Sequence, residues 1–292
     1  MDSRKWASWF VCWNAPRGHP DSQVVRTMDD TAPPQTPRMW QVAPDVTYAE
    51  MPVGGSIRPP LLTPWESSRV QEMPAGPRRQ RWLAERTLAK ALLRAAGGRR
   101  GIIDIREGVL GQPLVYEHGM PAAGTWLATT RRGSRIGVAA GARPIGLSSR
   151  RPVDDDDLRA GGLISARELR TAKVLFRDVR IARALVWALK EAAVEALRRG
   201  DFQLAELELT DSLELRCGDA HLRPLAIRVR RDAVVCVVAP ASADGPDGPL
   251  LIVDPEVEDH TASRVRDAFE RSLLRARRIL DARYRRLGWN PA

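Results

Sequence analysis

Two long amphipathic helices, separated and followed by strand-like segments, restrict the possible folds of this chain more than any other feature. Residues 180–199 repeat apolar side chains at the helical period, and Gly200 follows as a stop. Residues 77–98 do the same and end in Gly97 and Gly98. Each helix has one apolar face that another layer of structure must cover. We therefore predict an α+β fold.

The segments around these helices alternate or run apolar as strands do. Residues 135–140 and 144–147 predict a hairpin across a turn at 141–143. Residues 225–231 and 233–240 predict a second hairpin. The chain contains neither GxGxxG nor GxxxxGK[ST], which argues against a nucleotide-binding doubly wound sheet.

Three weaker patterns add further elements. Residues 163–176 predict a helix, because Ser165 and Glu168 have the spacing of a capping box. Residues 40–62 alternate weakly, which favours an edge strand. Residues 204–210 alternate as a strand does.

The charge balance indicates which partners the surface favours. The 292 residues include 46 Lys and Arg against 36 Asp and Glu, a formal net charge of +10. Such a surface favours nucleic acid, an anionic membrane, a polyanionic cofactor or an acidic protein. The chain has no basic stripe with stacking aromatic residues and no run near 18 apolar residues. We therefore expect neither nucleic-acid binding nor a membrane span.

The cysteines indicate the compartment. Cys12, Cys217 and Cys236 have no paired spacing, so neither a disulfide framework nor a CxxC zinc site is supported. A reducing environment suits this pattern, and we expect a cytoplasmic protein. The sequence gives no indication of an oligomeric state.

We divide the chain into four parts. Residues 1–38 lack periodicity and predict a disordered tail. Residues 39–147 and 148–258 each contain a long helix and strands, which is the order expected of two related halves. Residues 259–292 predict a C-terminal amphipathic helix.

Six short motifs occur in a recognisable order: RRQRWLAERTLAK, GQP, TWLATTRRG, GARPIGL, LISARE and VWALKEA. In order and spacing they are similar to the 4'-phosphopantetheinyl transferase superfamily in its longer, Sfp-type form. The resemblance covers about residues 65–200 at motif level and extends through the strands to about 240.

This resemblance implies two pseudo-symmetric α+β halves around a cleft that binds coenzyme A or its phosphopantetheine arm. In that family, magnesium held by acidic residues grips the pyrophosphate, and a serine of an acyl or peptidyl carrier protein attacks the phosphate. The cation is needed because two phosphates and an attacking alkoxide concentrate negative charge.

The resemblance also implies which residues would contact the coenzyme. A basic residue that reaches the nucleotide phosphate matches Arg86, and neighbouring Arg79 is a further candidate. Arg131 and Arg150 are candidates for holding phosphate oxygens directly, against the alternative of two surface arginines in an Arg-rich chain. The full set of predicted cofactor-binding residues is Arg79, Arg86, Gln112, Pro113, Thr130, Arg131 and Arg150.

The metal motif departs from the family pattern. Where the family has G-[IV]-D-[IV]-E, residues 146–150 read GLSSR, so Ser148 and Arg150 replace two carboxylates. Glu191 matches the third acid, and Glu195 stands where the family commonly has a lysine. A single carboxylate beside an arginine is a poor Mg²⁺ site, so we predict no metal ligands. The aspartates at 154–157 form either a substitute ligand set or a solvated acidic loop.

Three functions remain open after these substitutions. The first is metal-free chemistry on a carrier-bound or coenzyme A thioester, with Glu191 and Glu195 as catalytic acid–base candidates. The second is a non-catalytic protein that binds an acyl or peptidyl carrier through its basic surface. The third is a holo-carrier-protein synthase that is still active. All three belong to polyketide, fatty acid or nonribosomal peptide biosynthesis.

Overall fold

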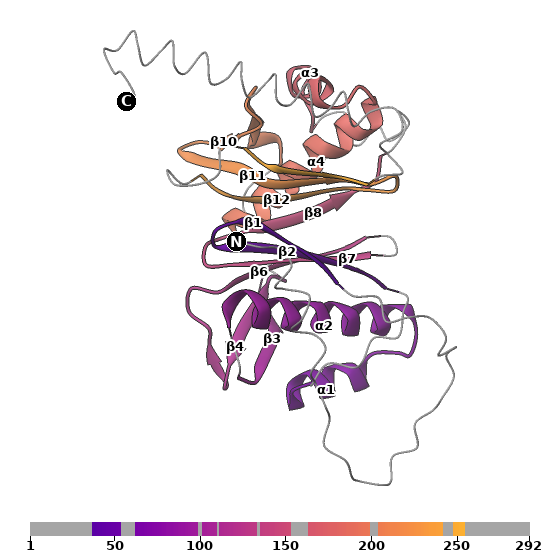
Figure 1. Cartoon of the computed structure of the whole chain (residues 1–292), viewed down its shortest axis with the longest axis vertical. Helices are drawn as coiled ribbons and strands as arrows, with labels where there is room; N and C mark the ends of the chain where they lie inside the picture. The colour runs from indigo at the N-terminus through magenta and orange to yellow at the C-terminus, as the bar shows by residue number, and fades with distance from the viewer. Residues whose placement is uncertain are drawn as a thin grey trace, which may run out of the picture. The chain divides into compact units, whose positions relative to one another are not determined.

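The computed structural model has a mixed α+β fold, which confirms the predicted class (Figure 1). It describes residues 37–53, 62–98, 101–109, 111–132, 135–152, 163–198, 204–241 and 248–254. The helix predicted over 259–292, the aspartates at 154–157 and all but the last two residues of the predicted tail lie outside these ranges. None of the helices within them is long and apolar enough to cross a membrane.

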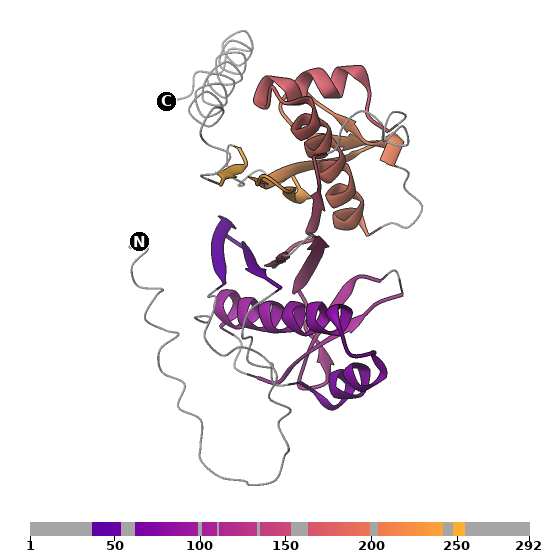
Figure 2. The ribbon, with the colours of Figure 1, turned by 90° about the vertical axis from the view of Figure 1, so that its right-hand side faces the viewer.

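The first sheet is antiparallel and one helix covers it. Its strands, in spatial order, are β1 (Arg38–Ala43), β2 (Val46–Pro52), β7 (Arg135–Gly141) and β6 (Trp126–Arg132). Helix α2 (Pro77–Gly97) lies across one face of this sheet, as Figures 1 and 2 show. Its fully buried Leu88, Ala89 and Leu92 pack with Ile136 and Val138 of β7, which confirms the predicted apolar face.

The second sheet contains β8 (Gly146–Arg150), β12 (Val234–Pro240), β11 (Ala220–Val229), β10 (Leu215–Cys217) and β9 (Glu208–Leu209) in spatial order. A last strand, β13 (Leu250–Val253), pairs parallel to β11. Helix α4 (Val179–Leu197) covers β8 and β12 with ten buried residues, six of them alanines, so helix and sheet approach closely. The hairpin of β11 and β12 confirms the second predicted hairpin.

Smaller elements complete the described fold. A third sheet contains β3 (Ile103–Glu107), β4 (Pro113–Glu117) and β5 (Met120–Pro121), and a single 3-10 turn (Leu204–Glu206) precedes β9. The strand predicted over 204–210 is therefore reduced to two residues. The remaining helices are α1 (Pro64–Glu72) and α3 (Ala166–Leu175).

The first predicted hairpin is wrong. Strand β7 pairs with β2 and β6, whereas β8 pairs with β12 of the second sheet. The chain leaves the first sheet after Gly141 and passes Pro144, which has no N–H to donate to a ladder. The side chains of β8 then alternate between α4 and the first sheet, and a hairpin with β7 would not allow this arrangement.

A buried ion pair attaches each short helix to a long one. At α1, Thr63 and Glu66 form a capping box, and Glu66 also pairs with Lys90 of α2. At α3, the predicted capping box of Ser165 and Glu168 is confirmed, and Glu168 pairs with Lys190 of α4 at 2.8 Å. In each case one carboxylate satisfies both the helix N-terminus and a buried lysine.

The two larger sheets pack against each other through an apolar layer. The layer includes Val46, Tyr48 and Ala139 of the first sheet and Leu147, Leu225, Val235 and Val237 of the second. All of these side chains are at most 3% exposed. Both sheets therefore bury their two faces, one against a helix and one against the other sheet.

One ionic cluster crosses this layer. Glu50 of β2 lies 3.0 Å from Arg228 of β11 and 3.6 Å from Arg230, and all three side chains are at most 4% exposed. The Tyr48 hydroxyl donates a hydrogen bond to Glu50, and Arg228 reaches Asp254 at 2.7 Å. Burial, together with the neighbouring Glu50 carboxylate, raises the pKa of Tyr48. Glu50 is therefore the shared counter-ion of two buried guanidinium groups.

Candidate functional site

The residues that replace the expected metal carboxylates meet the remaining one. Ser148 Oγ and Arg150 Nε each donate a hydrogen bond of 2.6 Å to Glu191 Oε2. Arg150 Nη2 also contacts Glu191 Oε1, and the guanidinium lies 4.2 Å from the centre of the Trp187 ring. We call Ser148, Arg150, Trp187 and Glu191 the β8–α4 cluster. Its geometry is a bidentate guanidinium–carboxylate pair stacked on an aromatic ring.

The pleat of β8 explains why these groups meet. Residues two apart on a strand share a face, so Gly146, Ser148 and Arg150 all point toward α4. At Gly146 the strand touches the helix backbone, because an ideal Cβ there would lie 1.7 Å from the carbonyl oxygen of Ala192. This close contact aligns β8 with the turn of α4 that carries Glu191.

Glu195 lies one turn further along α4 and has a different role. Its Oε2 accepts a 2.7 Å hydrogen bond from the backbone N–H of Leu147, a donor on the edge strand β8. Burial raises the pKa of Glu195 to about 7, and the Leu147 hydrogen bond and Arg198 only partly oppose it. The carboxyl group therefore exchanges its proton near neutral pH, as an acid–base group must.

The stability of the protein should reflect this titration. A carboxyl whose pKa rises on folding from 4.5 to about 7 binds more protons in the folded state between those values, so stability falls as pH rises. Relative to Glu195→Gln, the wild-type protein should lose about 2.5 kcal/mol of unfolding free energy between pH 5 and pH 8. Urea titrations of both proteins across this range would measure the difference. Parallel curves would contradict the raised pKa.

A second ionic group joins α2 to β6. Arg131 Nη2 donates a 2.9 Å hydrogen bond to Glu85 Oε1, and Arg131 Nε contacts Glu85 Oε2. Arg86 Nη1 lies 3.9 Å from Glu85, and its guanidinium stacks at 4.7 Å over Trp82. Glu85 and Arg86 are each 1% exposed, whereas the Arg131 side chain is 41% exposed. We call Glu85, Arg86 and Arg131 the α2–β6 cluster.

The remaining predicted contact residues lie at different depths. Thr130 is partly buried beside Arg131 on β6. Pro113 is buried at the start of β4, and the Gln112 carbonyl accepts a 2.7 Å hydrogen bond from Gly108. Arg79 is partly exposed, about two turns before Arg86 on α2, and none of the contacts described for the two clusters involves it.

Electrostatic interactions connect these groups. Glu107 of β3, whose register partner is Pro113, is one of the charges that act on both Arg86 and Arg131. Glu85 in turn raises the pKa of Glu195, which brings the α2–β6 and β8–α4 clusters within electrostatic range. Five predicted residues therefore lie in or next to the two clusters: Arg86, Arg131, Arg150, Glu191 and Glu195.

Sequence reasoning missed several residues in or next to these two clusters. Glu85 has no motif of its own and is separated from Arg131 by 46 residues, so no local pattern identifies the pair. Arg198 closes the end of α4 with its guanidinium 4.2 Å from the Trp126 ring of β6. Only Trp187 carried a signal, because it lies one helical turn before Glu191.

The arrangement does not suit a magnesium ion. In the described ranges, no group of three or more His, Cys, Asp or Glu side chains could hold a metal. Both oxygens of Glu191 already face the Arg150 guanidinium, which would repel a divalent cation. The residues present therefore do not fit the metal that the family resemblance implies.

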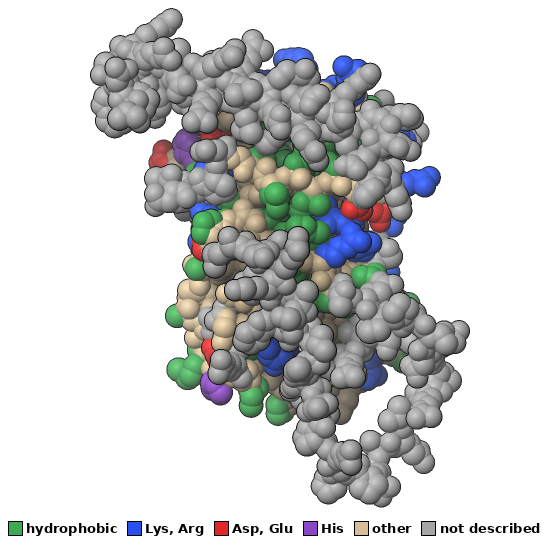
Figure 3. Space-filling model, in the orientation of Figure 1, with side chains coloured by type: hydrophobic (Ala, Val, Ile, Leu, Met, Phe, Trp, Pro, Cys, Tyr) green, Lys and Arg blue, Asp and Glu red, His purple; other side chains and the backbone are tan. Residues whose placement is uncertain are grey.

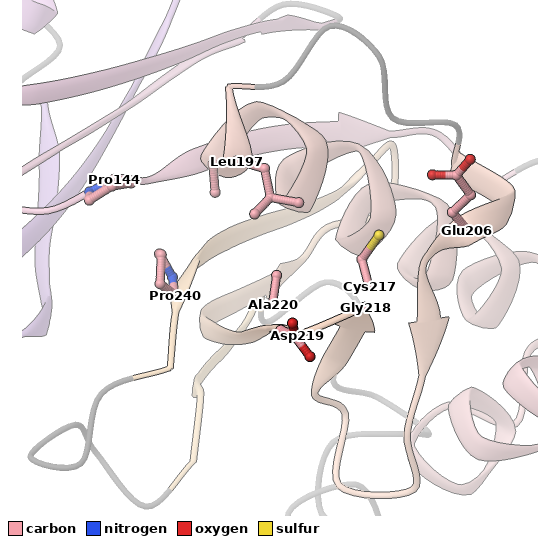
Figure 4. A pocket seen from close by; sticks show the side chains of 9 residues that line it. Pro144, Leu197, Glu206, Cys217, Gly218, Asp219, Ala220 and Pro240 are labelled. Atoms are coloured by element: carbon pink, nitrogen blue, oxygen red, sulfur yellow. The ribbon is translucent and has the colours of Figure 1, made fainter.

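The surface shows scattered basic side chains and one pocket that none of the predicted site residues lines. On the face seen in Figure 3, the described Lys and Arg side chains occur at several separate places and form no continuous basic stripe. A pocket of about 760 Å³ lies at the C-terminal end of α4, beside the turn between β10 and β11 (Figure 4). Its lining includes Leu197, Glu206, Cys217 and Asp219 but none of the predicted site residues.

Comparison with known proteins adds no relative. A scan against protein-family models found no match, and a search of curated proteins also found none. Function must therefore be inferred from the side chains themselves.

Proposed function

We propose that the chain is a 4'-phosphopantetheinyl transferase-like protein that binds a coenzyme A-type polyanion without a metal ion, in carrier-protein-dependent biosynthesis. The observation that carries this proposal is the Arg150–Glu191 pair. It lies at the position where the family resemblance expects the metal carboxylates. A guanidinium there supplies positive charge and a two-pronged donor for phosphate oxygens.

We also propose that the fold consists of two related halves. The order β2–β7–β6 in the first sheet has a counterpart in β8–β12–β11 of the second, with antiparallel pairing throughout. In the first set, α1 with its capping box and then the long helix α2 follow β2. In the second set, α3 with its capping box and then the long helix α4 follow β8. The long helices carry Lys90 and Lys190, which pair with the capping-box glutamates. These parallels support the pseudo-symmetry expected of an Sfp-type fold.

The reaction proposed for this site is acid–base chemistry on a coenzyme A or carrier-bound thioester. The pKa of about 7 at Glu195 favours this possibility, because such a carboxyl can both accept and donate a proton near pH 7. Glu191 is less suited to the role, because its oxygens are held by Ser148 and Arg150. A non-catalytic carrier-binding protein is the alternative, in which the same clusters only hold the ligand.

Calorimetry with coenzyme A tests the binding proposal. We expect binding in the presence of a chelator, unchanged by added Mg²⁺, and weakened about tenfold in Arg150→Ala, because one charged hydrogen-bonding group is lost. The mass of an apo carrier protein incubated with coenzyme A, Mg²⁺ and this protein separates the functions. A phosphopantetheine mass gain would establish ordinary transferase activity and refute the metal-free proposal.

Restoring the carboxylates should restore a metal site. In the double variant Ser148→Asp, Arg150→Glu, three carboxylates including Glu191 would surround the position of the guanidinium, and their repulsion would favour Mg²⁺. We expect Mg²⁺ to raise the melting temperature of this variant by several degrees and to leave the wild-type protein unchanged. The matched control, Ser148→Asn, Arg150→Gln, removes the same groups without adding charge. An equal Mg²⁺ response in both double variants would contradict the assignment.

A further inference from the structure

The two arginines proposed to hold phosphate are each already occupied by a glutamate of the same chain. Glu85 binds Arg131 through two guanidinium nitrogens, and Glu191 binds Arg150 in the same way. The two pairs come from different elements, α2 with β6 and α4 with β8. A ligand therefore meets an arginine that already has an anionic partner in both clusters.

We infer that Glu85 and Glu191 set the affinity threshold of this site by acting as internal anions that a ligand must displace. This inference rests on the proposed function, because it concerns the same arginines. A carboxylate carries one negative charge, whereas a phosphate monoester carries between −1.5 and −2 and offers three acceptor oxygens. Only an anion of higher charge density than a carboxylate gains enough from the exchange. The site selects polyphosphate groups and rejects carboxylates.

Glu85 and Glu191 weaken the binding of every ligand by the same mechanism. A tethered carboxylate keeps its arginine paired most of the time, and a ligand binds only to the fraction of molecules in which the pair is open. Removing the carboxylate makes all molecules competent and so raises the apparent affinity. The factor is the same for every ligand, so weak, singly charged anions whose binding to the wild-type protein is too weak to detect become detectable.

The surroundings allow the pairs to open. The Arg131 side chain is 41% exposed while Glu85 is 1% exposed, so the arginine is the partner that can move toward a ligand. Arg86 stays beside Glu85 and offsets its charge after that movement. At the other cluster, Arg150 keeps its stacking on Trp187 and Ser148 continues to donate to Glu191. Neither glutamate is left without a polar partner in the open state.

Titration calorimetry of the full chain with inorganic pyrophosphate, orthophosphate and acetate tests this inference. We expect Glu191→Gln to bind pyrophosphate about tenfold more tightly than wild type, and to bind acetate more tightly by a similar factor, so that acetate binding becomes detectable. Glu85→Gln should act in the same direction. Ser148→Ala removes, without changing charge, the donor that satisfies Glu191 after Arg150 leaves, so it should disfavour the open state and lower the apparent affinity. This opposite direction separates release of the arginine from a general gain of positive charge.

Glu72→Gln is the matched control. It removes the same charge from an exposed ion pair with Arg69 and should change pyrophosphate affinity less than twofold. Should Glu85→Gln fail to fold, the Glu191→Gln and Ser148→Ala results still decide the matter. Unchanged affinity in Glu191→Gln, together with weaker binding in Arg150→Ala, would overturn the inference and leave the proposed function standing. Absence of coenzyme A binding with tighter pyrophosphate binding in Glu191→Gln would support the inference and refute the proposed function.

Discussion

Gly146→Ala is expected to destabilise the protein by about 3 kcal/mol, at the upper end of the cost of overpacking. The added methyl would lie 1.7 Å from the Ala192 carbonyl oxygen and 2.7 Å from the Ala196 nitrogen. Both are backbone atoms of α4, so no side-chain rotation relieves the overlap. The helix must move away from β8 as a whole, which also separates Ser148 and Arg150 from Glu191. Chemical denaturation measures the loss of stability.

Gly137→Ala serves as the control for this prediction. It also adds a methyl to a central part of a strand, but its neighbours are side-chain atoms, the Thr130 methyl at 3.0 Å and the Tyr48 ring at 3.3 Å, which need to shift by only a few tenths of an ångström. We expect a cost of about 1 kcal/mol there. If the two variants lose equal stability, the contact between β8 and α4 is not as tight as described.

Glu50→Ala should destabilise the protein by about 3–5 kcal/mol, because it removes the buried carboxylate that Arg228 and Arg230 share and leaves them only the more exposed Asp254 and Asp232. Arg228 and Arg230 are at most 4% exposed, so water cannot take the place of the carboxylate. The Tyr48 hydroxyl would lose its acceptor as well. Urea denaturation of the variant and the wild-type protein measures the difference.

The double variant Glu50→Leu, Arg228→Met distinguishes the charge from the contact. Replacing both partners by apolar side chains removes the desolvation cost of this pair, so part of the lost stability should return, although Arg230 still lacks Glu50 and Asp254 loses Arg228. Glu72→Ala, which breaks an exposed pair, should cost less than about 1 kcal/mol. A Glu50→Ala cost as small as that of Glu72→Ala would show that the ionic cluster does not stabilise the fold.

Local patterns predicted the elements whose periodicity or capping is strong. Helices α2, α3 and α4 and the β11–β12 hairpin are confirmed, because amphipathic spacing and a tight turn are local properties. Helix α1 was missed although Thr63 and Glu66 have the same capping-box spacing that identified α3. Its nine residues make only about two and a half turns, too few to repeat an apolar face clearly, so the capping box was the one local indication of this helix.

Pairing between distant segments could not be predicted in the same way. Strands β7 and β8 look like a hairpin in sequence, but the partner of β8 lies almost ninety residues later. The choice depends on burial against α4 and the first sheet, which no local pattern records. The Glu85–Arg131 pair could not be predicted for the same reason, because its residues are far apart in the sequence. Ser148 and Arg150 meet Glu191 across 43 and 41 residues, and their positions in the short sequence motifs singled out all three residues without indicating this contact.

The apolar layer between the sheets limits how this chain can be rearranged. Tyr48, Leu147 and Leu225 are buried only because both sheets are present, and Glu50 finds its cations on the opposite sheet. Neither sheet with its helix is therefore expected to fold alone, because separating the two would expose the apolar face of each sheet to solvent. A substitution in one sheet changes the packing around side chains of the other sheet. Substitutions on the two sides of the layer are therefore expected to occur together.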